Sequence, residues 1–153
     1  MNKKVIDALN AGRSRELSAI IQYLAFHYEM DDQQYGKLAK TWKETGIAEM
    51  KHAEALAERI LFLGGEPTTK PDAPAQKGLK IDAQLALGEK LEADAVQMYN
   101  DAVKLCAAEG DQGTKDVFEK LLEDEEAHLD SFQNILAHVK DLGPAYLATL
   151  TGE

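Results

Sequence analysis

The sequence predicts an all-α protein. Four long helices form a bundle, one long crossover joins the second helix to the third, and a short fifth helix ends the chain. Two observations lead to this fold class. The four prolines of the 153-residue chain leave stretches 1–66 and 75–143 without proline and rich in helix-favouring residues. Apolar positions in both stretches recur every three or four residues, as on a buried helix face, and no useful run alternates with the period of a strand.

Short polar segments at 31–34 and 110–113 divide the two stretches and so predict the helix boundaries. We expect helices at about 3–31, 35–63, 82–109, 113–142 and 144–150. The last begins at Pro144, because Gly143 ends the fourth helix and proline suits the first position of the next. Connections of about four residues fold each long pair into an antiparallel hairpin, and one domain spans 1–153.

The connection between the two hairpins, residues 64–81, predicts the topology. It has 18 residues, including three prolines and three glycines. A 28-residue helix is about 42 Å long, and an extended connection of 18 residues spans up to about 60 Å. The connection can therefore run the length of the bundle and let the second and third helices lie parallel.

Composition narrows the function classes. The net charge of −10 disfavours nucleic acid and anionic membranes as partners and favours cations. Cys106 is the only cysteine, so no intrachain disulfide forms and a reducing cytoplasm fits. The first residues lack the apolar run of a signal peptide, and no apolar stretch is long enough to span a membrane. We expect a soluble, acidic, cytoplasmic domain.

The most informative feature is a set of charged residues on helix faces that the apolar pattern assigns to the core. Two copies of Glu-x-x-His occur, at 49–52 and 125–128, and each follows another glutamate by 33 residues. A shift of 76 residues relates Glu16, Tyr23, Glu49 and His52 to Glu92, Tyr99, Glu125 and His128. Two half-sites that face each other across a pseudo-twofold axis are therefore expected.

This constellation predicts a di-metal site. The i, i+3 spacing puts Glu and His on one helix face, where both can bind one ion. A single Glu-x-x-His motif is typical of a helix face exposed to solvent. Two copies on faces that the apolar pattern assigns to the core do not fit that explanation. Four buried carboxylates without partners would be very costly, whereas two divalent cations balance them. Carboxylate and imidazole suit iron or manganese, and ferritin-like di-metal bundles use this ligand pattern.

At these residues the chain resembles bacterioferritins, the haem-containing ferritins. The similar stretches are 16–23, 49–53 with 58–63, 124–128 and the terminal helix around 142–147. The resemblance implies a ferritin-like domain in a hollow shell of 24 subunits, built of twofold dimers, in which each subunit is a ferroxidase that stores iron. The Fe²⁺ is oxidised by O₂ or H₂O₂, and a reductase or ferredoxin is a candidate partner for iron release.

The resemblance also implies residue roles. Two Fe per subunit would be held by Glu16, Glu49, His52, Glu92, Glu125 and His128. Glu49 and Glu125 are bridging candidates, Tyr23 is a further catalytic residue, and Tyr99 is a close neighbour of the site. A histidine and an acid that some members carry before Glu-Met-x-His are missing from 42–48, which disfavours an inner-surface iron site there.

Met50 has two interpretations. It follows Glu49 by one residue and so points about 100° away from the bundle interior, onto the subunit flank. Spacing alone favours an ordinary interface methionine. The resemblance implies that Met50 is an axial ligand of haem b, shared across a twofold axis with one haem per two subunits.

Two other function classes remain open. One is a rubrerythrin-like or manganese-catalase-like enzyme that removes peroxide, although a single cysteine cannot form the Cys-x-x-Cys iron domain usual in rubrerythrins. The other is a non-catalytic haem- or metal-binding bundle. We interpret His27 and His138 as surface or packing histidines and Cys106 as a packing residue inside its helix.

Overall fold

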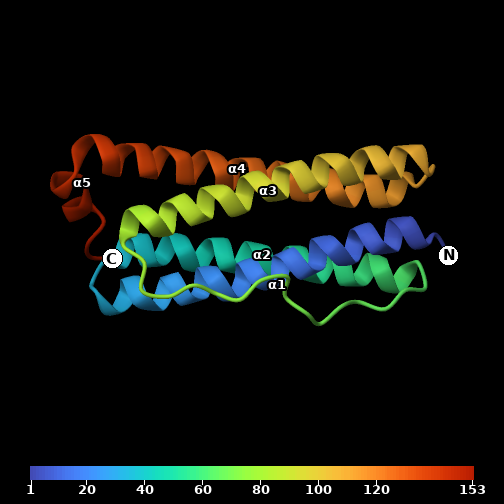
Figure 1. Cartoon of the computed structure of the whole chain (residues 1–153), viewed down its shortest axis with the longest axis horizontal. Coiled ribbons are helices and arrows are strands. Elements are labelled where there is room, and N and C mark those ends of the chain that lie inside the picture. The colour runs from blue at the N-terminus through green and yellow to red at the C-terminus, as the bar shows by residue number, and fades with distance from the viewer.

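The computed structural model describes residues 1–153 and contains five α-helices and no strand. The long helices are α1 (Lys3–Asp32), α2 (Gly36–Phe62), α3 (Ile81–Ala108) and α4 (Gln112–Leu142). The short helix α5 (Pro144–Thr149) lies at one end of the bundle, the end opposite the N-terminus (Figure 1). The predicted fold class is confirmed, and each predicted helix end lies within one residue of the observed one.

The small differences at the helix ends have local causes. Only the first part of the polar segment 110–113 separates two helices, because Gln112 already belongs to α4. Asp111 is the N-cap of α4, and its side chain accepts a hydrogen bond from the backbone N–H of Thr114. Gly110 supplies the turn before it with a φ of 71°, a conformation that glycine adopts without strain. A capping aspartate thus starts α4 one residue earlier than predicted.

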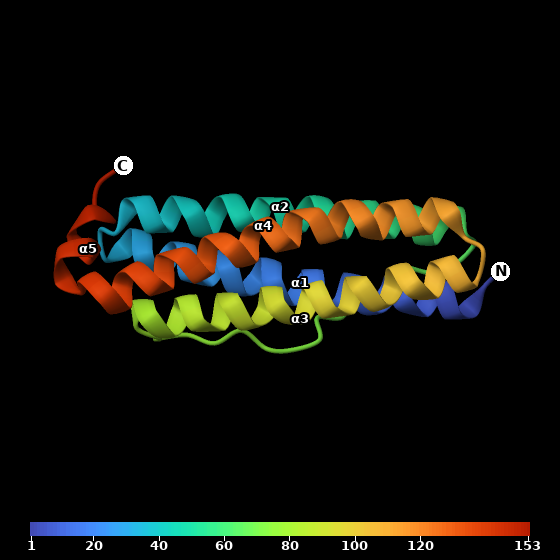
Figure 2. The same ribbon diagram turned by 90° about the horizontal axis from the view of Figure 1, so that it is seen from above.

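The two hairpins lie side by side with α2 and α3 parallel, as the long connection predicted (Figures 1 and 2). Residues 63–80 form this crossover, which runs along α1 from one end of the bundle to the other. Side chains of α1 hold it there. Arg13 Nε donates to the carbonyl of Thr68 at 2.9 Å, and Gln22 Nε2 donates to the carbonyl of Gln76 at 2.9 Å. The crossover is therefore an ordered part of the fold.

The apolar core consists of two clusters. One has eleven buried residues, including Val5, Tyr99 and Phe118, toward the end that holds the N-terminus. The other has ten, packed around Trp42, whose ring centroid lies 4.9 Å from that of Phe132. Cys106 belongs to the first cluster and is fully buried, which confirms its interpretation as a packing residue.

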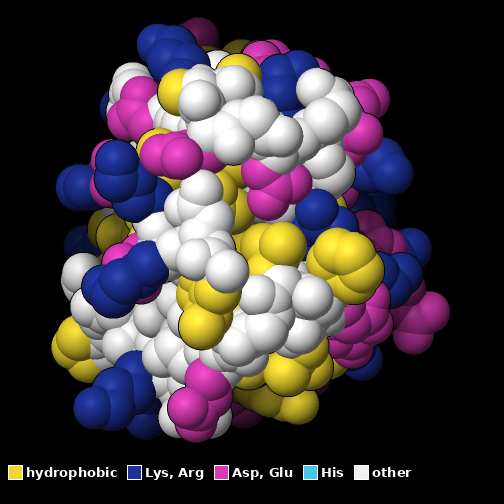
Figure 3. All heavy atoms as spheres, turned by 90° about the vertical axis from the view of Figure 1, so that its right-hand side faces the viewer, with side chains coloured by type: hydrophobic (Ala, Val, Ile, Leu, Met, Phe, Trp, Pro, Cys, Tyr) yellow, Lys and Arg dark blue, Asp and Glu magenta, His cyan; other side chains and the backbone are white.

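Several large hydrophobic side chains remain exposed on the outside of the bundle. Those on α1 and α2 are Ile21, Tyr28, Ile47, Met50, Leu61 and Phe62. Figure 3 looks onto the end where the chain begins and α2 ends, and hydrophobic side chains are visible there among charged ones. No helix of the structure has the length and hydropathy needed to cross a bilayer. These hydrophobic side chains are in contact with solvent in the single chain.

Candidate metal centre

A polar layer separates the two apolar clusters at the middle of the bundle. Each long helix contributes to it: α1 supplies Glu16, α2 supplies Glu49 and His52, α3 supplies Glu92, and α4 supplies Glu125 and His128. All four glutamates are fully buried, His52 is 5% exposed, and His128 is the most accessible of the six. The structure thus brings together every residue that the two repeated motifs singled out.

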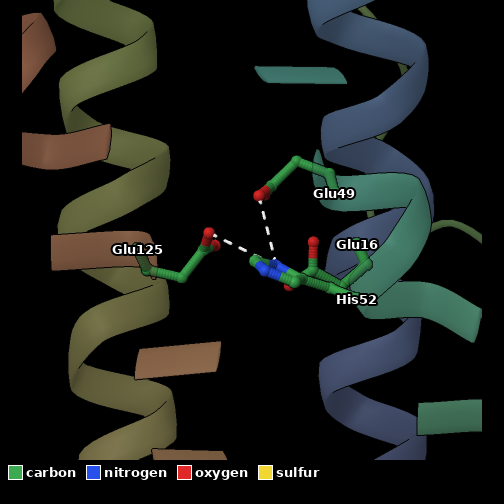
Figure 4. Close-up of side chains that lie close together, drawn as sticks. All are labelled: Glu16, Glu49, His52 and Glu125. Carbon is green, nitrogen blue, oxygen red and sulfur yellow. Dashed lines mark ion pairs between the residues drawn. The ribbon is translucent and has the colours of Figure 1, made fainter. Parts of the chain in front are cut away.

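The six side chains form two overlapping groups whose ligand atoms lie within 4.8 Å of one another. One group is Glu16, Glu49, His52 and Glu125, and the other is Glu49, Glu92, Glu125 and His128. Figure 4 shows the first group, with Glu125 reaching from α4 toward His52 on α2. Glu49 and Glu125 belong to both groups, which is the arrangement expected of carboxylates shared by two ions.

The histidine nitrogens point at the carboxylates. His52 Nδ1 lies 3.3 Å from Glu49 Oε1 and 3.5 Å from Oε1 of both Glu16 and Glu125. On the other side, His128 Nδ1 lies 3.0 Å from Glu125 Oε1 and 3.3 Å from Glu49 Oε1. Each imidazole therefore faces the same oxygens that a metal ion would share with it.

Unpartnered polar atoms indicate that this donor set fits metal ions. Glu49 Oε1, His52 Nδ1 and Glu92 Oε2 are buried and have no hydrogen-bond partner in the structure. Buried polar atoms are nearly always paired, so unpaired ones call for an explanation such as an ion. Hard carboxylate oxygens together with imidazole nitrogens are a donor set that iron or manganese accepts.

Two tyrosines hold the outer glutamates. The hydroxyl of Tyr23 donates to Glu92 Oε1 at 2.6 Å, and that of Tyr99 donates to Glu16 Oε1 at 2.5 Å. Burial and the neighbouring carboxylates raise the pKa of both phenols well above its usual value. Both tyrosines therefore remain protonated donors, and the repeat that relates them in sequence relates their contacts as well.

Arg15 is the residue of the site that the sequence argument missed. Its side chain enters the polar layer and contacts Glu49 and Glu125 directly through Nη1. Nη1 also lies 3.2 Å from Glu16 Oε2, and Nη2 lies 3.3 Å from Glu92 Oε1. Burial opposes the charge, but attraction to the glutamates outweighs it and keeps the pKa of Arg15 well above its usual value. One guanidinium thus touches all four carboxylates.

The buried charges shift one another's protonation. Burial and the nearby Glu49 raise the pKa of Glu16 to about 7. Burial would also raise the pKa of Glu49, but Arg15 and the two histidines hold it well below its usual value. Burial opposes the charged form of His52, yet contacts with Glu16 and Glu49 raise its pKa to about 11. Without metal the site therefore retains protons, which metal binding has to release.

Asp124 holds one of the two histidines from outside. Its Oδ2 lies 2.8 Å from His52 Nε2, the ring nitrogen that faces away from the glutamates. A carboxylate on the far nitrogen of a ligand histidine fixes the ring and its tautomer. The repeat places Ala48 at the position related to Asp124, so His128 lacks this support. The two half-sites are therefore related but not identical.

Comparisons with known proteins identify the family. The family described as ferritin-like domain matches residues 6–142. The bacterioferritin of Desulfovibrio desulfuricans is 42% identical over 149 residues, which cover 97% of this chain and 83% of that protein. This chain belongs to the bacterioferritin family. The bacterioferritin of Rhodobacter capsulatus is 37% identical over 147 residues, covering 96% of this chain and 91% of the relative.

A solved bacterioferritin has the same fold. The X-ray structure of the Desulfovibrio desulfuricans bacterioferritin matches with a TM-score of 0.96 at 42% identity and covers 98% of this chain and 88% of the other. That work describes the diiron site of the relative in different catalytic states. The resemblance inferred from the motifs is confirmed, and the polar layer lies in a fold that holds such a site in this relative.

Other residues of the chain lie where the sequence placed them. Met50 is 44% exposed on the flank of α2, next to the buried Glu49. His27 packs against α2, with Nδ1 2.7 Å from the carbonyl of Ala39. His138 lies outside the site, beside the ring of Tyr146. Neither of these two histidines belongs to the groups that can hold an ion.

A sequence signal for Arg15 did exist. Gly12, Arg15 and Ala19 recur at intervals of three and four residues, so Arg15 shares the buried face of α1 with two small residues. A charge in such a register is as informative as the glutamates. Asp124 gave no comparable signal, because it is exposed and lies in an acidic run of α4.

Proposed function

We propose that the protein stores iron and is a ferroxidase, which oxidises Fe²⁺ to Fe³⁺ at the centre of each bundle. The observation that carries this proposal is the pair of overlapping carboxylate and imidazole groups inside the ferritin-like fold. The relatives support it, because they are bacterioferritins over nearly the full chain. Iron is here both the substrate and the cargo.

Each residue has a definite task in this proposal. Glu16 and His52 would hold one Fe²⁺, Glu92 and His128 the other, and Glu49 and Glu125 would serve both. When bound, each Fe²⁺ supplies one electron, so two ions together reduce one H₂O₂ with two protons to two waters, and O₂ is the other candidate oxidant. Tyr23 keeps Glu92 oriented through its hydroxyl. The apolar clusters on both sides exclude bulk water from the layer.

Changing Glu125 to Gln tests the assignment, because it removes one shared negative charge while it preserves the shape of the side chain. We expect the initial rate of Fe²⁺ oxidation to fall by at least about tenfold, since even partners outside the ligand shell commonly alter metal sites by 10–100-fold. The rate is followed by the near-ultraviolet absorbance of Fe³⁺.

The neighbouring Glu126 provides the control. It is exposed on α4, so Glu126→Gln makes the same chemical change outside the layer and should oxidise Fe²⁺ at the parent rate. A Glu125→Gln protein that folds and matches this control would contradict the ligand assignment.

A haem site is the second part of the proposal. Met50 presents a half-exposed thioether on the outer face of α2, outside the polar layer. A twofold axis beside α2 would bring two copies of Met50 together as the axial ligands of one haem b, one per two subunits. A symmetric pair of neutral sulfur donors is accessible only at such an isologous interface.

We further propose that twofold dimers assemble into a closed shell of 24 subunits. The exposed hydrophobic side chains of α1 and α2 are the surface that such contacts would cover. Iron mineral would form inside the shell, and a reductase or ferredoxin would supply electrons for its release. The buried single cysteine fits the reducing cytoplasm, where we propose that the shell works.

A further inference from the structure

The guanidinium of Arg15 already occupies the space between the four glutamates. It contacts the Oε2 atoms of Glu16, Glu49 and Glu125 through Nη1. The side chain is 4% exposed, so the charge lies inside the bundle and not at its surface. Arginine keeps its proton at every pH at which proteins fold. The site therefore contains a permanent cation of its own.

Arg15 contacts the residues that both metal groups need. Glu49 and Glu125 are members of both groups. Arg15 Nη1 contacts the Oε2 atom of each of these two glutamates, and the histidine Nδ1 atoms face their Oε1 atoms. A carboxylate that gives one oxygen to each of two ions needs both oxygens free. Arg15 in this position consequently competes with the binding of two ions.

Charge leads to the same conclusion. Two divalent ions balance four ionised carboxylates and two neutral imidazoles, with nothing left over. A retained guanidinium would add an unbalanced positive charge to a buried layer, and unbalanced buried charges are expensive. In the absence of metal the same guanidinium is favourable, because it offsets repulsion among the glutamates.

Arg15 occurs in only one of the two half-sites, and one of its side-chain nitrogens has no partner. The 76-residue repeat places Leu91 at the position related to Arg15, so the site has one such arginine and not two. The backbone carbonyl of Leu91 accepts a hydrogen bond from Arg15 Nη2 at 3.2 Å. Arg15 Nε is buried without any partner. The side chain is thus held chiefly by the carboxylates themselves, which metal ions would claim.

We propose that Arg15 is a built-in competitor for the metal centre, which fills the site in the metal-free protein and is displaced when two metal ions bind. It sets how tightly the centre binds metal, since every binding event has to remove the guanidinium from Glu49 and Glu125. The inference rests on the proposed function, because it takes the six-residue layer to be the metal site.

Arg15→Leu tests the competition, because it gives α1 the residue that the repeat has on α3. Co²⁺ serves as the probe: it binds the same donors, and its visible absorption reports binding without turnover. With Arg15 in place, the binding-competent state is a minor one, and apparent affinity falls by its population. We expect the variant to bind Co²⁺ at least about tenfold more tightly. Its metal-free form should melt at a lower temperature than the parent, and Co²⁺ should raise its melting temperature by more.

Arg13→Leu is the matched control. Arg13 is a half-buried arginine of the same helix, but it bonds to the carbonyls of Thr68 and Ala53 and not to a carboxylate. Its loss should lower the stability of metal-free and loaded protein equally and leave the Co²⁺ affinity unchanged. Equal Co²⁺ affinity of the parent and Arg15→Leu would overturn the competition alone. Absence of Co²⁺ binding in both would overturn the proposed function and the competition together.

A second measurement does not depend on a variant. In a crystal structure of the parent protein loaded with Co²⁺, the guanidinium of Arg15 should have left Glu49 and Glu125. Arg15 still in contact with both carboxylates beside two bound ions would overturn the displacement.

Discussion

Met50 and Glu49 are neighbours in sequence with opposite surroundings. Glu49 is fully buried in the polar layer, whereas Met50 is 44% exposed on the flank of the same helix. In the proposed function, Glu49 serves chemistry inside the subunit and Met50 serves an interface. A substitution of Met50 should leave the interior of the bundle intact.

Met50→Leu keeps the volume and helix propensity of the side chain but has no donor sulfur. The variant should assemble and oxidise Fe²⁺ like the parent, and it should lose the Soret and α bands of low-spin haem after reconstitution. Absorption spectra of both proteins at saturating haem provide the measurement. Stoichiometric low-spin haem in the variant would show that another residue is the ligand.

At the scale of residues, the sequence predicted that the glutamates and histidines come together, but it did not predict that Arg15 lies among them. The spacing of glutamates and histidines placed six side chains in one layer, because helical periodicity determines which face each residue occupies. The charge count behind the two-ion prediction left out Arg15, whose long side chain reaches the layer from the position next to Glu16. The register of α1 places Arg15 on the buried face, but which carboxylates its side chain contacts depends on the surrounding space.

At the scale of elements, Asp111 joins the start of α4 to the end of α2. Its carboxylate accepts hydrogen bonds from the backbone and hydroxyl of Thr114 and lies 3.0 Å from Arg59 Nη2. Burial raises the pKa of Asp111, but these contacts outweigh burial and hold it below its usual value. The ionised carboxylate therefore stabilises the folded state, and this contribution disappears as the pH falls through its lowered pKa.

Asp111→Asn isolates the charge, because asparagine also caps helices well. The variant should be less stable than the parent by about 1–2 kcal/mol at pH 7. The difference should shrink as the pH is lowered below about 4, the usual pKa of aspartate, where Asp111 in the unfolded parent begins to take up a proton that the folded parent does not yet bind. Thermal unfolding of both proteins at pH 7 and pH 3 measures this. A difference that stays constant with pH would mean that the charge has no role.

The elements themselves were highly predictable from sequence. Proline-free stretches and periodic apolar residues determine where long helices form, and short polar breaks determine where they turn. The start of α4 lies one residue earlier than predicted, because one cap, Asp111, decides the first turn of the helix. The hydrogen bond from the backbone N–H of Thr114 to Asp111 identifies this cap in the structure.

At the scale of the whole molecule, one chain leaves apolar surface uncovered. Leu61 and Phe62 are 62% and 75% exposed near the end of α2. The same helix carries Ile47 and Met50, which are also exposed. Contacts between copies would remove this surface from water and stabilise an assembly.

The proposed shell of 24 subunits predicts the mass of the assembly. Size exclusion with light scattering at micromolar concentration should give about 0.4 MDa, 24 times the 16.8 kDa subunit. Leu61→Glu would place a charge in the uncovered surface and should shift the mass toward smaller species. A parent protein that is only monomer or dimer at this concentration would contradict the shell.

The contacts between the crossover and α1 determine which residues of the two segments tolerate substitution. Its contacts with α1 are made largely by its own main chain: Asn10 and Arg13 bond to the carbonyls of Glu66 and Thr68, and the amide of Asp72 donates to the hydroxyl of Ser18. Backbone groups are the same whatever side chain they carry. Most substitutions between 66 and 78 should therefore be neutral, while the polar residues of α1 that hold the crossover carry the constraint.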